Sequence, residues 1–426
     1  MKYAFAIGIK KWKTITTGVA LLLAGSMSQA QTYSLGRVLD SIEVRNPGLQ
    51  QYALKTQASF ASGTAARAWM APVAGVGLSE FPYSSGRKMN GGPMPRKMLM
   101  LRLEQMFPNF SQQRKAETYE RSYANQNKDD RATMKNMLFA KAKMAYYDAF
   151  IAQKKLAVLR VQEQQLQLLI KISEGRLAYN KADLPNIYKA RATLSDLKST
   201  RINLQGMTDQ AISILNALMN LPVDHPLQID TTANFQQHQV AILQIDTAYV
   251  QRNRSDIKHT QDEIHSMELK QQVIAAMGKP TFGITWDNMR MNSGMYMYSA
   301  MASLSIPIAP WFSKGYKSKI TAMDFQIQAM EKRKENQVSG ALGNIRKDWL
   351  KLRSAKEDLQ IFREEVIPAY AKTYQANLNA FSENNGDIYE TLMAWNDLTM
   401  KKMEYYDKLA GLLNLRVMLE TEMQQP

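Results

Sequence analysis

The sequence contains no cysteine, and this absence excludes every feature that depends on a thiol. These features are a disulfide framework, a thiolate metal site and a lipid anchor on an N-terminal cysteine. Histidine is scarce, and none of the four residues belongs to an HExxH motif or to a close metal pair with acids: His225, His238, His259 and His265. A phosphate-binding glycine loop and a Gly-x-Ser-x-Gly motif are also missing. We therefore expect no enzymatic activity and no cofactor.

Long hydrophobic runs are missing too, because no stretch reaches the roughly 20 apolar residues that a spanning helix requires. Residues 1–30 instead have the three parts of a secretory signal peptide. A basic start is followed by a short apolar core at 15–25 and by the cleavage site Ser28-Gln29-Ala30. Cleavage after Ala30 predicts an exported protein without a lipid anchor, which is either soluble or a β-type membrane protein.

The positive charge of the chain does not indicate nucleic-acid binding. Removal of the signal peptide takes away four lysines and no acid, which lowers the net charge from +16 to +12. The remaining lysines and arginines alternate with acidic residues along helical patterns, as on solvated helix faces. Because export also separates the chain from nucleic acid, we expect no such partner.

A short polar break occurs twice, at 176–198 and again 204 positions later at 380–402. Asn180 corresponds to Asn384, and the Asp183 position to that of Asp387. Asparagine tolerates the backbone that ends a helix, and aspartate can cap the next one. Each break therefore predicts the tip of an antiparallel helical hairpin, near 180–184 and 384–387, in a duplicated chain.

The flanking patterns give the chain its predicted organisation. Two short helices at 34–46 and 47–70 precede the long ones, and Pro368 is expected to interrupt the third long helix. The long helices are predicted at about 110–178, 185–220, 316–380 and 388–423. The resulting units are a first repeat at 31–220, a proline-containing linker at 221–235 and a second repeat at 236–426.

Four segments alternate in polarity with a period of two, which is typical of strands. They form one pair within 73–107 (73–81 with 97–107) and a second pair within 280–308 (280–289 with 295–308). One face of these segments is apolar with aromatic ends, as in a transmembrane barrel. A half-buried sheet of a soluble protein has the same periodicity, so two interpretations remain open.

These features occur in an order that resembles the TolC-type outer-membrane efflux proteins over essentially all of 34–421. The motifs that carry the resemblance are Asn46-Pro47-x-Leu49, Met106-Phe107-Pro108, Ala145-Tyr146-Tyr147, Asn186-Ile187 with Ala190-Arg191, and Leu304-Ser305-Ile306-Pro307. The heavy-metal (CzcC/CusC-like) branch is a candidate within this family.

The resemblance implies a mainly α fold with a transmembrane β part. Three chains would each supply four strands to a twelve-stranded barrel in outer-membrane lipid, and paired helices to a periplasmic α-barrel. Such a homotrimer is the passive exit duct of a tripartite efflux system, with a periplasmic adaptor and an inner-membrane pump as partners. The alternatives are a type I protein-secretion duct and, from a different class, a soluble periplasmic coiled-coil scaffold or adaptor.

The resemblance also implies where the functional residues lie. The periplasmic gate would involve Glu390, with Phe381, Asp387 and Asp183 beside it. Both aspartates are also explained as helix caps, and Glu390 as part of a solvated helix face. The hairpin tips would dock the adaptor through Arg176, Asn180, Asn186, Arg191, Asn384 and Gly386.

Methionine is the one unusually abundant residue: of the 27 copies, five lie in 89–106 and five in 289–301, in and beside the predicted strands. Six of them fall in or beside the predicted strands, on the face opposite the apolar one: Met98, Met100, Met106, Met295, Met297 and Met301. Thioether sulfur suits Cu(I) or Ag(I), so these residues could line a path of weak metal sites. Methionine also serves as flexible filler, and no histidine accompanies these positions.

Overall fold

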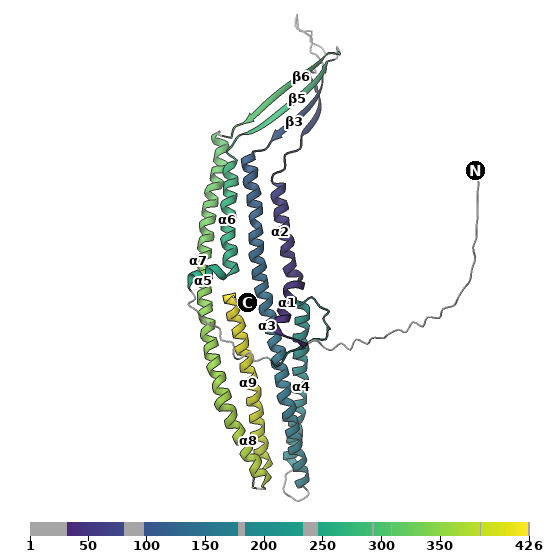
Figure 1. Ribbon diagram of the computed structural model, residues 1–426, viewed down its shortest axis with the longest axis vertical. Helices are drawn as coiled ribbons and strands as arrows, with labels where there is room; N and C mark the ends of the chain where they lie inside the picture. The colour runs from purple at the N-terminus through teal and green to yellow at the C-terminus, as the bar shows by residue number, and fades with distance from the viewer. Residues whose placement is uncertain are drawn as a thin grey trace, which may run out of the picture.

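The computed structural model describes residues 32–80, 98–177, 184–232, 246–291, 294–307, 309–383 and 385–424. The molecule is elongated, with a β-sheet at one end and two helical hairpins at the other (Figure 1). The predicted signal peptide and the break residues Asn180, Asp183 and Asn384 lie outside the described ranges. No helix within those ranges is long and apolar enough to cross a membrane.

Helices make up most of the described chain, and their positions follow the predicted patterns. The first half contains α1 (Leu35–Arg45), α2 (Pro47–Ala65), α3 (Phe110–Leu177) and α4 (Leu184–Leu218). The second contains α5 (Thr247–Asn253), α6 (Ser255–Ala276), α7 (Pro310–Ile361), the π-helical turn η2 (Phe362–Val366), α8 (Ile367–Ser382) and α9 (Ile388–Met423).

Four of the strands form one antiparallel sheet. They are β2 (Val73–Ser79), β3 (Met98–Phe107), β5 (Thr281–Met291) and β6 (Tyr296–Ser305), in the order β2-β3-β5-β6. The pairing of β3 with β5 joins segments that are far apart in the sequence, because Met98 lies opposite Met291 and Phe107 opposite Phe282. A sheet built from both halves of the chain is therefore the shared element of the fold.

The first two helices, α1 and α2, begin with the caps that the sequence indicates. Ser34 caps α1 by accepting a bond from the N–H of Arg37, and Pro47 occupies the first turn of α2. Asn46 caps α2 through its Oδ1, while its Nδ2 donates to the carbonyl of Leu218 at 2.8 Å. The Asn46-Pro47 motif thus ends one helix, begins the next and binds the end of α4.

Two local details differ from the sequence expectations. Helix α2 ends at Ala65, short of the expected position near 70, and Trp69 beyond it packs edge-on against Phe107 and Phe110. The linker at 221–235 contains a short strand, β4 (Gln228–Ile229), which pairs in parallel with β1 (Thr32–Tyr33). In both places the observed structure depends on a contact with a distant part of the chain, which the local sequence pattern does not show.

The expected interruption at Pro368 takes the form of a π-helical turn. Proline has no N–H to donate to the helix ladder, so the turn before it must rearrange. The N–H of Ile367 donates to the carbonyl of Phe362, five residues earlier, which widens the helix over η2. Helices α7 and α8 are consequently continuous, with a local change in winding between them.

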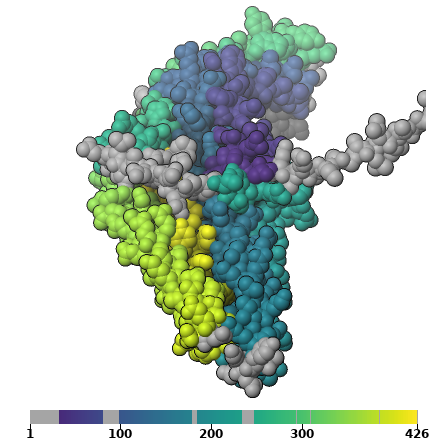
Figure 2. Space-filling view, turned by 60° about the horizontal axis from the view of Figure 1, so that its bottom comes forward, coloured from purple at the N-terminus to yellow at the C-terminus, as the bar shows by residue number. Residues whose placement is uncertain are grey.

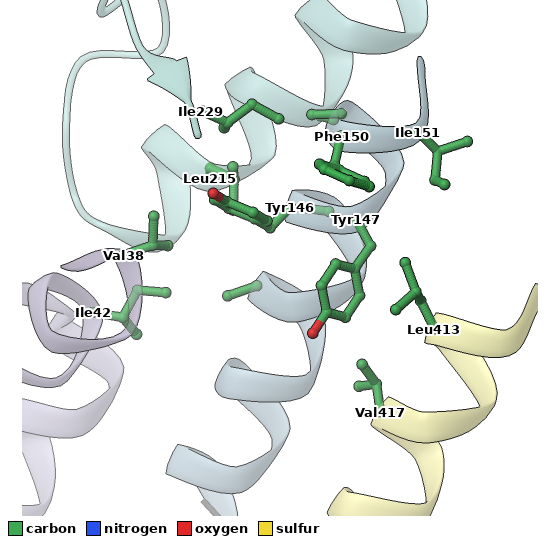
Figure 3. Close-up of a cluster of buried hydrophobic side chains, with 14 of the residues drawn as sticks. Val38, Ile42, Tyr146, Tyr147, Phe150, Ile151, Leu215, Ile229, Leu413 and Val417 are labelled. Carbon is green, nitrogen blue, oxygen red and sulfur yellow. The ribbon is translucent and has the colours of Figure 1, made fainter. Parts of the chain in front are cut away.

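The largest buried cluster lies where α3 passes α1, α4 and α9 (Figure 3). Tyr146 is its centre, and its hydroxyl lies 3.1 Å from the carbonyl oxygens of both Tyr33 and Asp230. Asn216 of α4 donates to the carbonyls of Val223 and His225 nearby. These bonds hold the linker and β1 against the middle of α3, between the sheet and the hairpin tips.

Candidate functional site

The two helical hairpins, α3–α4 and α8–α9, pack against each other at the end opposite the sheet (Figure 2). Trp395 of α9 is fully buried in a cluster that includes Leu166 of α3, Leu197 of α4 and Phe381 of α8. Side chains from all four helices therefore form one apolar core. The relative position of the hairpins depends on that core.

Arg176 joins the hairpins near their tips. Its Nη1 donates to the carbonyl of Phe381 at 2.7 Å, and its Nη2 donates to the carbonyl of Ser382 at 3.3 Å. The guanidinium also lies 4.2 Å from the centre of the Phe381 ring, which is 2% exposed. A cation at the C-terminal end of α8 is favourable because the free carbonyls there carry partial negative charge. The sequence placed these two residues in separate roles, and the structure brings them together.

The turn between α8 and α9 depends on a close backbone approach. A Cβ atom added to Gly386 would lie 2.9 Å from the backbone nitrogen of Phe381, so only glycine fits there. Asp387 occupies the N-cap position of α9, but its side chain makes no capping bond. The first turn is held instead by Thr391, whose Oγ1 lies within bonding distance of the carbonyls of Asp387 and Asn377.

The other predicted tip residues lie in the first turn of α9 and in the first two turns of α4. Glu390 is exposed on the first turn of α9, where a negative charge favours the helix start, and no described residue forms an ion pair with it. Asn186 is half-buried on α4. Arg191 is exposed and pairs with Glu174 at 2.7 Å, while the Lys189 ammonium lies over the Tyr389 ring.

A hollow of about 620 Å³ lies between α3, α4 and α9, beside the core of the hairpins. Its lining combines methionines and charged residues, among them Met393, Met400, Lys189, Asp196 and Glu404. Lys155 and Asp407 form an ion pair at its rim. Sequence reasoning did not find this hollow, because its walls come from three helices whose relative rotation no local pattern specifies.

A buried acidic residue lies closer to the sheet, between α3 and α6. Asp129 is buried, and its Oδ2 has no hydrogen-bond partner among the described residues. Burial, together with the neighbouring charge of Asp262, raises the pKa of Asp129 to about 6, although Lys258 and His259 act in the opposite direction. The charged form of Asp129 is therefore costly at neutral pH.

The two faces of the sheet differ in exposure along much of β2, β3 and β5, whereas β6 is exposed on both faces except at Met297. Val76 and Tyr298, on the apolar face, are 75% and 79% exposed. On the opposite face Met98 and Met291 are only 4% and 7% exposed. The methionine-bearing face is therefore the less exposed one on β2, β3 and β5. In the middle of that face, Arg102 donates two bonds to Asp287, at 2.7 and 3.1 Å.

The strand register places the methionines in rows that the sequence did not specify. Met100 and Met297, both predicted, lie on either side of Met289, which was not among the predicted site residues. Met98 lies opposite Met291, the second residue that was missed. The remaining predicted methionines are separate from these rows: Met106 lies opposite Gly283, Met301 opposite Thr285, and Met295 precedes β6.

Comparison with known proteins gives the same picture of the fold. No protein-family model matches the sequence, and no curated protein is similar to it. Among solved structures, the outer-membrane channel OprN is similar with a TM-score of 0.73 and 15% identity, over 92% of this chain and 90% of that one. CusC, a protein that forms a transmembrane channel, is similar with a TM-score of 0.72 and 16% identity, over 93% of this chain and 95% of CusC.

The outer-membrane channel MtrE of Neisseria gonorrhoeae, in its open state, has a TM-score of 0.69 and 14% identity. That match covers 91% of this chain and 88% of MtrE. The likeness extends from the sheet to the hairpins, because the matched share exceeds nine-tenths of this chain in each case. This chain therefore has the fold of outer-membrane channels.

Proposed function

We propose that three copies of this chain form an outer-membrane exit duct of a tripartite efflux system. The duct receives small substrates from an inner-membrane pump through a periplasmic adaptor and releases them outside the cell. The chain itself performs no chemical reaction in this account. The observation that carries the proposal is the four-stranded sheet, whose edges and apolar face have no partners within the described chain.

The edges of the sheet support assembly with other copies. Strand β2 pairs only with β3, and β6 only with β5, so each edge presents free backbone donors and acceptors in the described chain. The strands alternate in direction across β2-β3-β5-β6, so β6 of one copy can pair antiparallel with β2 of the next. Such a head-to-tail contact closes into a ring, and three copies give a twelve-stranded barrel.

The apolar face supports insertion into lipid. Its exposed side chains come from all four strands: Val76, Leu78, Leu99, Leu101, Leu103, Phe282, Ile284, Trp286, Tyr296, Tyr298 and Leu304. Gln105, Asn288 and Arg290 lie on the same face. A soluble monomer nevertheless rarely exposes so large an apolar surface. Strands β3, β5 and β6 contain 10, 11 and 10 residues, which is about the 9–11 residues needed to cross a bilayer.

The length of the helices favours a long tunnel on the periplasmic side of the outer membrane. Helix α3 has 68 residues and spans about 100 Å at the usual rise per residue. Two hairpins from each of three copies would surround a central passage. The division into two repeats, 31–220 and 236–426, belongs to the same proposal and would make the tunnel pseudo-sixfold.

The hairpin ends are proposed as the gate and the docking surface. The gate would consist of Glu390, Asp387, Asp183 and Phe381, with Arg176 holding the two hairpins together at its level. Adaptor docking would use the neighbouring tip residues Asn180, Asn186, Arg191, Asn384 and Gly386. An adaptor that displaced Arg176 from Phe381 would release the α8–α9 hairpin and widen the entrance.

A pair of adjacent substitutions in β6 tests the orientation of the sheet. Ala300 lies on the apolar face and Ser299 on the opposite one, and both are small and exposed in the single chain. Ala300→Lys should abolish most of the trimer in the outer-membrane fraction, because a lysine facing lipid costs about 2–4 kcal/mol at mid-bilayer. Ser299→Lys should leave the trimer intact.

The readout is the mobility of unboiled and boiled outer-membrane fractions on a denaturing gel. A soluble sheet would tolerate both lysines equally, since both positions face water in that case. Equal behaviour of the two variants, with the protein in the soluble periplasmic fraction, would support a periplasmic scaffold and overturn the duct.

A further inference from the structure

We propose that five methionines on the less exposed face of the sheet form a thioether site for soft monovalent cations, Cu(I) or Ag(I). The residues are Met98, Met100, Met289, Met291 and Met297. The inference rests on the proposed function, because the face that bears them must line the duct. It names a substrate class for the duct and adds Met289 and Met291, which were not among the predicted site residues.

Strand register brings these side chains together. Met100 lies opposite Met289, and Met289 lies opposite Met297, so one row crosses three strands. Met98 and Met291 form the adjacent row on the same face. Directly opposed residues have Cβ atoms about 5 Å apart. Rows on one face repeat about every 7 Å along the strand. The flexible methionine side chain can close both gaps, so three or four sulfur atoms can meet.

The surroundings of the rows favour metal binding over simple hydration. Met98 and Met291 are almost completely buried, and Met100, Met289 and Met297 are half-buried. The same strands expose Leu99 and Tyr298 on their other face. Thioether groups in this partly dehydrated position do not take part in a hydrogen-bond network. They offer a coordination shell that water and hard ligands do not supply.

The neighbouring charges restrict the metal to a soft ion. The next row towards the helices contains Arg102 and Asp287, which neutralise each other through two hydrogen bonds. The Asp287 carboxylate is therefore occupied, and Cys is absent from the whole sequence. Zn²⁺ and Ca²⁺ prefer nitrogen, thiolate or oxygen ligands, so this methionine group suits Cu(I) and Ag(I) instead.

The position in the fold suggests a role in release. Met98 begins β3 and Met291 ends β5, so the rows lie at the end of the sheet farthest from the helices (Figure 1). In the proposed trimer this is the outer mouth of the duct, and three copies would place a ring of thioethers there. Several weak, adjacent sites let an ion enter and leave without being trapped.

Silver binding by the purified, detergent-solubilised full chain tests the site. Silver nitrate in chloride-free buffer serves as the probe, and calorimetry gives the stoichiometry and affinity. The variant is the triple substitution Met100→Leu, Met289→Leu and Met297→Leu. Leucine keeps the volume and costs little stability, but it removes the sulfur. We expect affinity for Ag(I) to fall by at least about tenfold, as when metal ligation is disturbed in other proteins.

A matched control replaces three exposed methionines from separate parts of the helical region, Met137, Met207 and Met277, by leucine. This control should bind silver like the wild type. Thioethers carry no titratable proton, so wild-type affinity should also be unchanged between pH 5.5 and 7.5. Equal silver binding by the wild type and the sheet variant would overturn the site, and so would an equal loss in the control.

Conductance separates this inference from the proposed function. The sheet variant, reconstituted in planar bilayers, should conduct potassium ions like the wild type. Conducting channels with unchanged silver affinity contradict the methionine site alone. Wild-type protein that forms no channels contradicts the duct itself, and then any silver binding would have to be assigned to a surface group rather than to a lumen.

Discussion

The two ends of the molecule differ in how far their apolar side chains are exposed. At the hairpin end, Trp395 and Phe381 are buried by helices of the same chain. At the sheet end, Val76 and Tyr298 are mostly exposed, although they belong to equally regular elements. The hairpin end is complete within one chain. In the proposed duct, the sheet end is completed by lipid and by further copies of the chain.

This difference separates two kinds of stability. Burial of an apolar side chain contributes stability wherever the partner is part of the same chain, as it is around Trp395. In the proposed duct, the exposed side chains of the sheet contribute only after assembly. Loss of a buried residue at the hairpins should therefore act on any isolated chain, whereas changes on the apolar face of the sheet should act on membrane insertion.

Trp395→Ala should have the largest effect of the helical substitutions. Removal of this fully buried side chain from the hairpin core should cost about 3–5 kcal/mol, because the cavity cannot collapse completely. Thermal unfolding of the purified protein, followed by circular dichroism, would measure the loss. The Nε1 of Trp395 has no hydrogen-bond partner among the described residues, so Trp395→Phe should cost much less. Equal losses of stability in the two variants would show that packing of the Trp395 ring is not its main contribution to stability.

Arg176→Ala should have an intermediate effect and should act on the entrance. It removes two charge-assisted bonds and a cation–π contact, together worth about 1–3 kcal/mol. We expect higher single-channel conductance in planar bilayers, because the hairpins lose their link. Arg176→Lys should restore little, since lysine lacks the planar fork.

Arg191→Ala is the matched control for that experiment. Arg191 lies near the same tips but pairs with Glu174 on the exposed surface, where an ion pair contributes about 0–1 kcal/mol. Its conductance should stay at the wild-type level. A closed Arg176→Ala channel, or an equally open Arg191→Ala channel, would contradict the assignment of the link.

Asp129→Asn should have the smallest effect, and that effect should depend on pH. The pKa of Asp129 is raised in the folded chain from 3.8 to about 6. Stability therefore falls as the pH rises between these two values, and the full cost of the charge is present above about pH 6. Asparagine carries no charge at any pH. We expect a gain of about 1 kcal/mol at pH 7.5 and a smaller one at pH 5, by thermal unfolding at both pH values. The half-exposed neighbour Asp130, which lies beside His259, should give no such gain as Asp130→Asn.

The sequence was sufficient to predict most elements, because their signals are local. Asn46-Pro47 marks the start of α2, and the alternation in 295–308 marks β6. Pro368 predicts an interruption of the helix, and the structure has the π-helical turn η2 directly before it. Helix periodicity likewise located α9 at both ends. Each of these features depends on residues within one or two turns of one another.

The alignment of the strands and the packing of the hairpins could not be predicted from the sequence. The row of Met100, Met289 and Met297 depends on how β3, β5 and β6 align, and a shift by one residue would move every side chain to the other face. The link between Arg176 and Phe381 spans 205 positions and depends on how the two hairpins pack. Neither arrangement leaves a local signal, so the methionine row and the hairpin link required the structure.

The most direct test of the duct is the wild-type protein on a gel, with and without boiling, after separation of the outer-membrane and periplasmic fractions. We expect a detergent-requiring species in the outer membrane at three times the mass of the mature chain. Boiling should convert it to a monomer smaller than the 48.4 kDa of the full sequence, because the signal peptide has been removed. A monomer that stays in the soluble periplasmic fraction, unaffected by boiling, would contradict the duct.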